Sequence, residues 1–205
     1  MNQRRTSDPA DPIAARANRL AGRFAERAEA EGLVEITYAT TDSPFGPLLM
    51  AATSDGLVRI ALPGESFDPV LDDLAGRVSS RILELPARLD HVRRQLDSYF
   101  DGELTAFDLP IDWRLSHGFL LTARRVIASI PYGETLSYSQ VAAEAGSPRA
   151  HRAAGTACSN NPLPIVVPCH RVLATGGGLG GYGGGLPMKR ALLDLEQGRA
   201  PLRAP

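Results

Sequence analysis

The chain has 205 residues, of which 43% are hydrophobic, enough for one or two compact domains with a sizeable core. Its longest purely apolar stretches are short, such as residues 165–167, and its polar N-terminus lacks the apolar region of a secretion signal. These features exclude an integral membrane protein, so we expect no membrane partner and a cytoplasmic location. Two cysteines and four histidines without ligand spacing predict neither a structural disulfide nor a metal site, and we expect no cofactor.

The net charge of −1 conceals an asymmetry between the two halves of the chain. Residues 1–119 hold 13 Arg and 19 acidic residues, a balance of −6, whereas residues 120–205 hold nine Lys and Arg and four acidic residues, a balance of +5. A basic C-terminal half is compatible with a polyanionic partner there. Ordinary scatter of charge explains the asymmetry equally well, and the charge alone leaves both interpretations open.

The N-terminal third predicts one helix and then a small sheet. After a polar stretch over 1–10, apolar residues recur at helical spacing over 12–31, and we expect this amphipathic helix to pack on the body of the protein, with partner binding as the alternative. Three β-rich segments follow at 34–40, 47–53 and 57–62, separated by turn signals, which predicts a β-meander.

Two more helices are predicted after the meander, over 67–76 and 87–101, the second with an apolar stripe that ends before Gly102. We therefore divide the chain into an N-terminal tail and helix over 1–32, an α+β scaffold domain without obvious chemistry over 33–108, and a C-terminal domain over 109–200.

The C-terminal part predicts a helix-turn-helix. A helix over 119–130 stops before a Pro-Tyr-Gly turn; Ser137 then caps a short helix over 138–145, and a second helix covers 149–159. This second helix consists almost entirely of small residues, from which His151 and Arg152 project. It either packs tightly inside the domain or docks into a narrow minor groove of DNA, with Arg152 as its long cationic probe.

The segment around Cys169 carries the candidate chemistry. Prolines at 162, 164 and 168 exclude a regular helix, and we expect them to hold the backbone extended while the core fixes Cys169. The basic neighbours His170 and Arg171 are expected to favour the thiolate, and His170 is expected to act through a water. Glu196, on a helix predicted over 189–197, is available to orient the histidine. The other cysteine, Cys158, is expected to be a packed core residue.

A glycine-rich run over 176–185, with Tyr182 in its middle, separates the cysteine from that last helix. It does not match a phosphate-binding loop, because no Gly-Lys-Ser/Thr follows it. We interpret it as a mobile wall of a substrate pocket.

These residues together resemble the signature of the O6-alkylguanine-DNA alkyltransferases. The similar positions are Asn161-Pro162, Pro164-Ile165, Pro168-Cys169-His170-Arg171-Val172, Gly181-Tyr182, Gly184-Gly185, Lys189, Leu192-Leu193 and Glu196. The similarity extends from about Tyr38, where 42–46 matches the family's first hairpin, to about Gly198. The resemblance implies an α/β (α+β) fold, with a small N-terminal domain of β-meander and helices and a helical C-terminal domain with helix-turn-helix and active-site loop.

The resemblance also implies a function. A protein of this family flips O6-alkylguanine out of double-stranded DNA from the minor groove and transfers the alkyl group to its own cysteine, here Cys169, irreversibly and once per molecule. His170 would activate the thiol through a water, with Glu196 behind it, and the protein would act as a monomer without a cofactor. Position 183 departs from the pattern, because it is glycine where some relatives have a hydroxyl residue, which loosens the pocket.

Further roles follow from the resemblance position by position. Tyr138 would help rotate the nucleotide and supply a proton to the leaving guanine, Arg152 would fill the vacated place in the base stack, and Asn161 would brace the active-site loop. The remaining assignments are the carbonyls of Cys169 and Val172 and the amide of Gly183 as contacts to the base, Tyr182 and Lys189 as parts of the pocket, and Ser139, Ser147 and Thr175 as residues near the DNA backbone.

Three other functions compete with this one. A non-catalytic module that only flags alkylguanine would lack the acceptor, so Cys169 opposes it. A cysteine hydrolase would bring its catalytic residues together from distant parts of the chain, whereas Cys169 and His170 are adjacent. A helix-turn-helix regulator that reads sequence would need long polar side chains on its second helix, and these are scarce here.

Overall fold

The computed structural model describes residues 30–199, together with positions 16, 20, 22–24, 27, 28 and 202. The helix expected over 12–31 lies largely outside the described residues, although the described positions up to residue 30 are helical. Leu20 and Phe24 are 55% and 65% exposed, so these two side chains do not pack on the body as expected. Among the described residues, no helix combines the length and apolarity needed to cross a bilayer.

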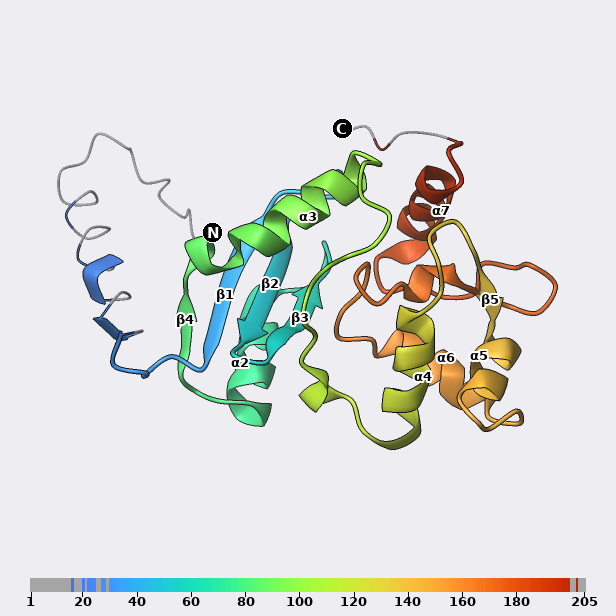
Figure 1. Ribbon diagram of the computed structural model, residues 1–205, viewed down its shortest axis with the longest axis horizontal. Coiled ribbons are helices and arrows are strands. Elements are labelled where there is room, and N and C mark those ends of the chain that lie inside the picture. Colours follow the sequence, from blue (N-terminus) through green and yellow to red (C-terminus); the bar gives the residue numbers. More distant parts are fainter. Residues whose placement is uncertain are drawn as a thin grey trace, which may run out of the picture.

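The N-terminal part of the body, which we call the sheet unit (residues 36–100), is built on a four-stranded sheet (Figure 1). Strands β1 (Ile36–Thr41), β2 (Leu48–Thr53) and β3 (Gly56–Ala61) are antiparallel neighbours, which confirms the predicted meander. A fourth strand, β4 (Ile82–Glu84), pairs parallel with β1 at the outer edge and was not predicted. Three residues are too few to show the alternation by which a strand is recognised.

Helices cover both faces of this sheet. Successive residues of β2 point to opposite sides, and its apolar residues are therefore buried under a helix on each face. Leu48 and Met50 share a core with α3 (Asp90–Phe100), which a 3-10 turn, η1 (Pro86–Leu89), precedes. Leu49 and Ala51 share another core with α2 (Phe67–Arg77). The helices predicted over 67–76 and 87–101 are thereby confirmed.

The C-terminal part, which we call the helical unit (residues 118–196), contains α4 (Gly118–Ala128), α5 (Tyr138–Glu144), α6 (His151–Ser159) and α7 (Gly185–Glu196). Ser137 and Gln140 form a capping box at the start of α5, and α5 packs against α6 as the predicted helix-turn-helix requires. Helix α7 begins four residues before the predicted start and includes Pro187 in its first turn. Proline is tolerated at this position because the backbone N–H groups of the first turn have no partner within the helix.

The two units meet along a shared core that runs from the α3 face of the sheet to helices α4–α7. Two short strands, β5 (Leu136–Ser137) and β6 (Val172–Leu173), pair in parallel within the helical unit. Strand β5 leads into α5, and β6 follows the turn that contains Cys169. The backbone N–H of Ile60 on β3 donates to the carbonyl of Pro162 at 2.8 Å. The edge of the sheet therefore holds the loop that precedes Cys169.

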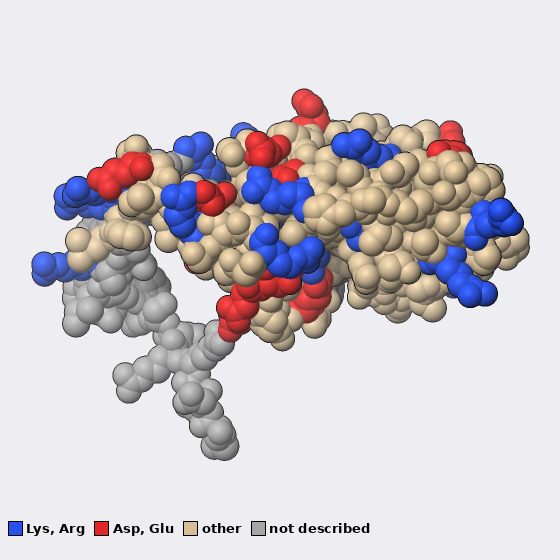
Figure 2. Space-filling model, turned by 90° about the horizontal axis from the view of Figure 1, so that it is seen from below, with Lys and Arg blue, Asp and Glu red and all other residues tan. Residues whose placement is uncertain are grey.

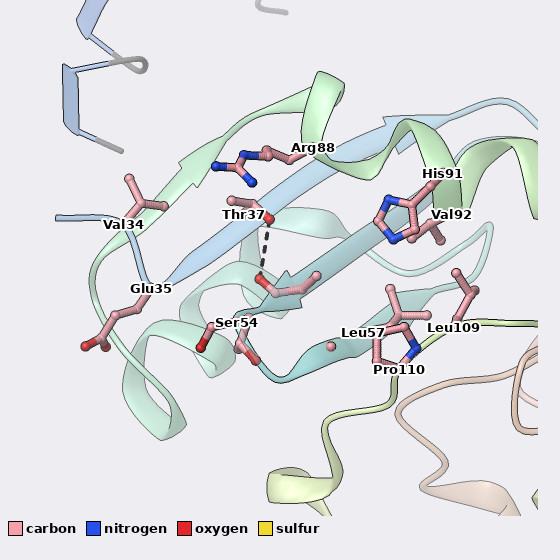
Figure 3. Close-up of a pocket in the computed structure, with 13 residues that line it drawn as sticks. Val34, Glu35, Thr37, Ser54, Leu57, Arg88, His91, Val92, Leu109 and Pro110 are labelled. Atoms are coloured by element: carbon pink, nitrogen blue, oxygen red, sulfur yellow. Dashed lines mark hydrogen bonds between the residues drawn. The ribbon is translucent and has the colours of Figure 1, made fainter. Parts of the chain in front are cut away.

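The sheet unit also has a cavity of about 420 Å³ beside η1 and the start of α3 (Figure 3). Arg88 and His91 lie along one side of it, and Thr37 at its floor donates a hydrogen bond to the Ala52 carbonyl. None of the residues predicted for the functional site lines this cavity.

Candidate active site

The segment before Cys169 is a succession of turns, so the extended backbone predicted from its prolines is wrong. The N–H of Val167 donates to the carbonyl of Leu163 at 2.8 Å, and Cys169 opens a 3-10 turn, η3 (Cys169–Arg171). Ile165 has a φ of 75°, a conformation that costs a β-branched residue on the order of 1–3 kcal/mol. Its complete burial holds it there. Prolines exclude a regular helix but leave tight turns open.

Asn161 ties this series of turns to the cysteine. Its Nδ2 donates both to the carbonyl of Val167, at 2.8 Å, and to the Sγ of Cys169, at 3.2 Å. Its Oδ1 accepts from the N–H of Leu163 at 3.1 Å. One buried amide therefore fixes the loop and supplies a hydrogen-bond donor to the sulfur.

Cys169 is only 4% exposed, and burial raises the pKa of its thiol. The hydrogen bond from Asn161 and the charge of Lys189 oppose this rise without cancelling it. Arg171 points to Glu196 instead of the sulfur, so the expectation that the basic neighbours produce a thiolate is wrong for this state of the protein. The thiol therefore needs a base to ionise it.

His170 is fully buried, and its Nε2 lies 2.8 Å from Oε1 of Glu196. Burial lowers the pKa of the imidazole, which favours the neutral form. The other ring nitrogen, Nδ1, has no hydrogen-bond partner among the described residues. A neutral imidazole that donates through Nε2 carries its lone pair on Nδ1 and can accept a proton there.

Glu196 is an acceptor for several donors at once. Burial alone would raise the pKa of its carboxyl, but hydrogen bonds from His170 and Arg171 prevail and hold it at about 2. Arg171 donates to both carboxylate oxygens at 2.9 Å, and the N–H of Gly133 donates to Oε2 at 3.2 Å. Tyr99, from the sheet unit, donates to Oε1 at 2.6 Å.

Sequence reasoning missed Tyr99, Arg171 and Gly133 as members of this network. The position of Tyr99 beside the apolar stripe of α3 marks it as a core residue, which it also is. Gly133 stands in a predicted turn, and its positive φ of 78° suits that turn. No sequence pattern indicates which carboxylate either residue contacts.

The glycine-rich run is anchored by Lys189 and Tyr138. Lys189 is fully buried, and its Nζ donates to the carbonyls of Val172, at 2.6 Å, and Leu179. Tyr138 packs against Gly180, where a Cβ would lie only 2.7 Å from the tyrosine Oη. Burial raises the pKa of Tyr138, so its hydroxyl keeps its proton.

Cys169 opens onto a cavity of about 420 Å³ between the two units. Its helical-unit side includes Cys158, Asn161, Tyr182 and Gly183, and its sheet-unit side includes Arg59, Leu62, Glu65, Asp73 and Arg77. A smaller cavity of about 290 Å³ shares Cys158, Ser159, Tyr182 and Gly183 with it and is otherwise lined by Tyr138, Gly155 and Gly181. Cys158 is thus a half-buried residue that packs against the main core, as expected, and also lines both cavities.

Known proteins share this arrangement over most of the chain. Residues 36–113 match the model of the 6-O-methylguanine DNA methyltransferase ribonuclease-like domain, and residues 119–198 match that of the DNA binding domain of the same family. The chain belongs to the 6-O-methylguanine DNA methyltransferase family. This finding confirms the resemblance seen in the sequence.

Relatives and solved structures of the family agree with this assignment. A methylated-DNA–protein-cysteine methyltransferase of Mycobacterium bovis is 41% identical over 166 residues, which cover 81% of this chain and 95% of that protein. A constitutive one of Bacillus subtilis is 36% identical, covering 78% and 94%. The crystal structure of Mycobacterium tuberculosis OGT in complex with DNA superposes with a TM-score of 0.69 at 40% identity, covering 80% of this chain and 95% of that chain. The predicted mixed α/β fold is confirmed.

The DNA-binding domain of the family covers α4 to α7, where the remaining predicted residues lie. Arg152, on the first turn of α6, is exposed, and no described residue forms an ion pair or hydrogen bond with its side chain. Ser139 and Thr175 are exposed, and Ser147 is half-buried in the connection between α5 and α6. These four residues line neither cavity at Cys169.

The small residues of α6 serve packing on one side of the helix. Ala154 and Ala157 are fully buried, and α6 contacts both α4 and α5. The opposite side of α6, with Arg152 and Thr156, is exposed. On the face seen in Figure 2, the basic side chains over the helical unit, at the right, have few acidic neighbours, whereas basic and acidic side chains are intermixed over the sheet unit.

Proposed function

We propose that the protein repairs double-stranded DNA by transferring the alkyl group of O6-alkylguanine to the Sγ of Cys169, irreversibly and once per molecule. Membership of the family and the names of its relatives support the reaction class. The observation that carries the assignment to this chain is the placement of Cys169. It lies at the wall of a cavity, next to a histidine that a buried carboxylate orients.

The transfer begins with the proton of Cys169. Because Nε2 of His170 is engaged by Glu196, Nδ1 is the ring atom that can take this proton, through an intervening water. The carboxylate of Glu196 stabilises the imidazolium that results, and the hydrogen bond from Asn161 stabilises the thiolate. The base thus supplies the ionisation that burial of the sulfur opposes.

The thiolate then attacks the alkyl carbon in line with the bond to O6. A carbon–sulfur bond forms, the carbon–oxygen bond breaks, and its electron pair leaves with the guanine, which takes a proton from Tyr138. The product is a thioether, which no described residue can reverse. The protein is therefore consumed in the reaction, and Lys189 contributes by holding the glycine-rich wall of the pocket.

Recognition requires the damaged nucleotide to leave the helix, at a cost of a few kcal/mol that is smallest for a poorly paired base. We propose that the exposed side of α6 enters the minor groove and that Arg152 occupies the vacated place in the stack. Tyr138 would crowd the phosphate, and the remaining contacts would come from the carbonyls of Cys169 and Val172, the amide of Gly183, the ring of Tyr182, and Ser139, Ser147 and Thr175. The protein would act as a monomer.

The test uses two cysteine variants and duplex DNA with a labelled O6-methylguanine. We expect the parent protein and Cys158→Ser to take up the label, and Cys169→Ser to bind the same DNA without taking it up. Binding without transfer by the parent protein would contradict the proposal and favour the module that only flags alkylguanine. Transfer that survives in Cys169→Ser would contradict the assigned acceptor.

A further inference from the structure

We infer that Tyr99 of the sheet unit is a positioning residue for alkyl transfer, because from across the boundary between the units its hydroxyl donates to the same oxygen of Glu196 that orients His170. This inference rests on the proposed function. It gives the sheet unit, which supplies neither the acceptor cysteine nor the DNA-binding helices, a part in the reaction that is exerted through Glu196 and His170.

The position of the hydroxyl is well defined by its surroundings. Tyr99 is 1% exposed, and its hydroxyl lies 2.6 Å from Oε1 of Glu196 and 3.4 Å from Nε2 of His170. Its ring packs against Phe107, at a centroid distance of 5.2 Å, and against Tyr132, at 6.2 Å. Burial raises the pKa of Tyr99 well above its ordinary value, so the hydroxyl remains a donor at every pH at which the protein works.

The hydroxyl competes with the histidine for one oxygen. Oε1 of Glu196 accepts from Tyr99, from His170 and from Nη2 of Arg171, whereas Oε2 accepts from Nε of Arg171 and from a backbone N–H. Each donor draws negative charge from the carboxylate and so weakens its stabilisation of a protonated imidazole. Removing the hydroxyl should therefore strengthen the pull of Glu196 on His170 and raise the pKa of the imidazole.

Among the groups that face His170, Tyr99 is the one that brings this effect from the sheet unit. The charged or titratable groups around the imidazole are Glu196 and Lys189 on α7, Arg171 and Cys169 on η3, Tyr182 in the glycine-rich run and Tyr99 on α3. Of these, only Tyr99 comes from the sheet unit, and it is the only tyrosine with a hydrogen bond to Glu196. Through this hydroxyl, the contact between the units reaches the hydrogen-bond network of the catalytic base.

Tyr99→Phe tests this inference, because phenylalanine keeps the ring and its packing and removes only the hydroxyl. The matched control is Tyr132→Phe. The hydroxyl of Tyr132 belongs to the same aromatic cluster but donates only to the backbone carbonyl of Leu195, at 3.5 Å. The single-turnover rate on DNA with O6-methylguanine is measured across pH, together with DNA binding and the melting temperature.

We expect Tyr99→Phe to bind DNA like the parent protein and to move the acid limb of the rate profile to higher pH by about half a unit to one unit. At a pH on that limb the rate would fall by about 3- to 10-fold, since one unit is a factor of ten in protonation. The Tyr132→Phe profile should coincide with that of the parent. An unmoved profile in Tyr99→Phe, or an equal shift in both variants, would overturn the inference.

A second readout separates this inference from the proposed function. The titration of the His170 imidazole, followed by NMR, does not depend on alkyl transfer. A parent protein that transfers nothing contradicts the proposed function, whereas a His170 pKa that is the same in parent and Tyr99→Phe contradicts the role of Tyr99. If Tyr99→Phe only lowers the melting temperature and leaves both profiles in place, Tyr99 is a packing residue and the inference fails.

Discussion

Replacing Asn161 by alanine should both destabilise the protein and slow the reaction, because one amide holds the loop and the sulfur. In Asn161→Ala, the carbonyl of Val167 and the N–H of Leu163 lose their side-chain partner. A buried polar group left without a partner costs about 1–3 kcal/mol. We therefore expect the free energy of unfolding to fall by about 2–4 kcal/mol, and the melting temperature of a protein of this size to fall by roughly 5–15 °C.

The same substitution removes the donor to the Sγ of Cys169, one of the groups that oppose the rise in the thiol pKa. The single-turnover rate should fall even at temperatures at which the variant is fully folded. Asn160→Ala is the matched control, since Asn160 is exposed and its side chain has no hydrogen bond to a described residue. Thermal unfolding and transfer from labelled DNA are measured for both variants. Equal melting temperatures and rates in the two variants would refute the reasoning.

Three other predictions follow from the geometry of the site. Gly180→Ala should slow transfer and lower the melting temperature, because a Cβ there would lie 2.7 Å from Tyr138 Oη at a φ of 65°, whereas Gly181→Ala, with open space around it, should do neither. The pKa of Glu196 is depressed to about 2 from an ordinary 4.5, so its contribution is present above pH 4.5 and is lost as the pH falls towards 2. Full protonation of Glu196 should lower the free energy of unfolding by about 3 kcal/mol, and part of this loss should already be measured by urea unfolding at pH 3 compared with pH 7. Glu196→Gln should lack this part of the pH dependence, and an identical pH dependence in both proteins would refute the prediction. Arg152→Ala should reduce repair of duplex DNA by about tenfold or more while leaving reaction with free O6-benzylguanine nearly unchanged, and equal losses on both would exclude a role in the base stack.

Much of the fold could be predicted because it is recorded in local patterns. The three meander strands are short β-rich segments separated by turn residues, and the helices around Ser137 and Gly146 carry their own start and stop signals. The strands β4, β5 and β6 could not be predicted, because segments of two or three residues have no periodicity and form only where a partner lies beside them. The turns before Cys169 were missed for a different reason: prolines exclude one conformation without choosing among the others.

The residues of the site could be predicted where they belong to the sequence signature. Contacts that form only when distant segments pack together could not be predicted. Cys169, His170 and Glu196 follow from the sequence, but the raised pKa of the thiol does not, because it depends on burial in the assembled core. The hydroxyl of Tyr99 reaches a carboxylate 97 positions away, and nothing near it in the sequence indicates that contact. Arg171 is adjacent to the reactive residues, yet its guanidinium faces Glu196, an orientation fixed by α7 and by the carbonyl of Ile130 in the assembled fold.

The most direct test of the central claim counts methyl groups per protein molecule. The protein is incubated with increasing excess of duplex DNA that carries O6-methylguanine, and the modified protein is digested and analysed by mass spectrometry. We expect transfer to reach a plateau of one methyl group per molecule, carried by the peptide that contains Cys169. Continued turnover beyond one equivalent, or a methyl group found on Cys158 with Cys169 unmodified, would contradict the account.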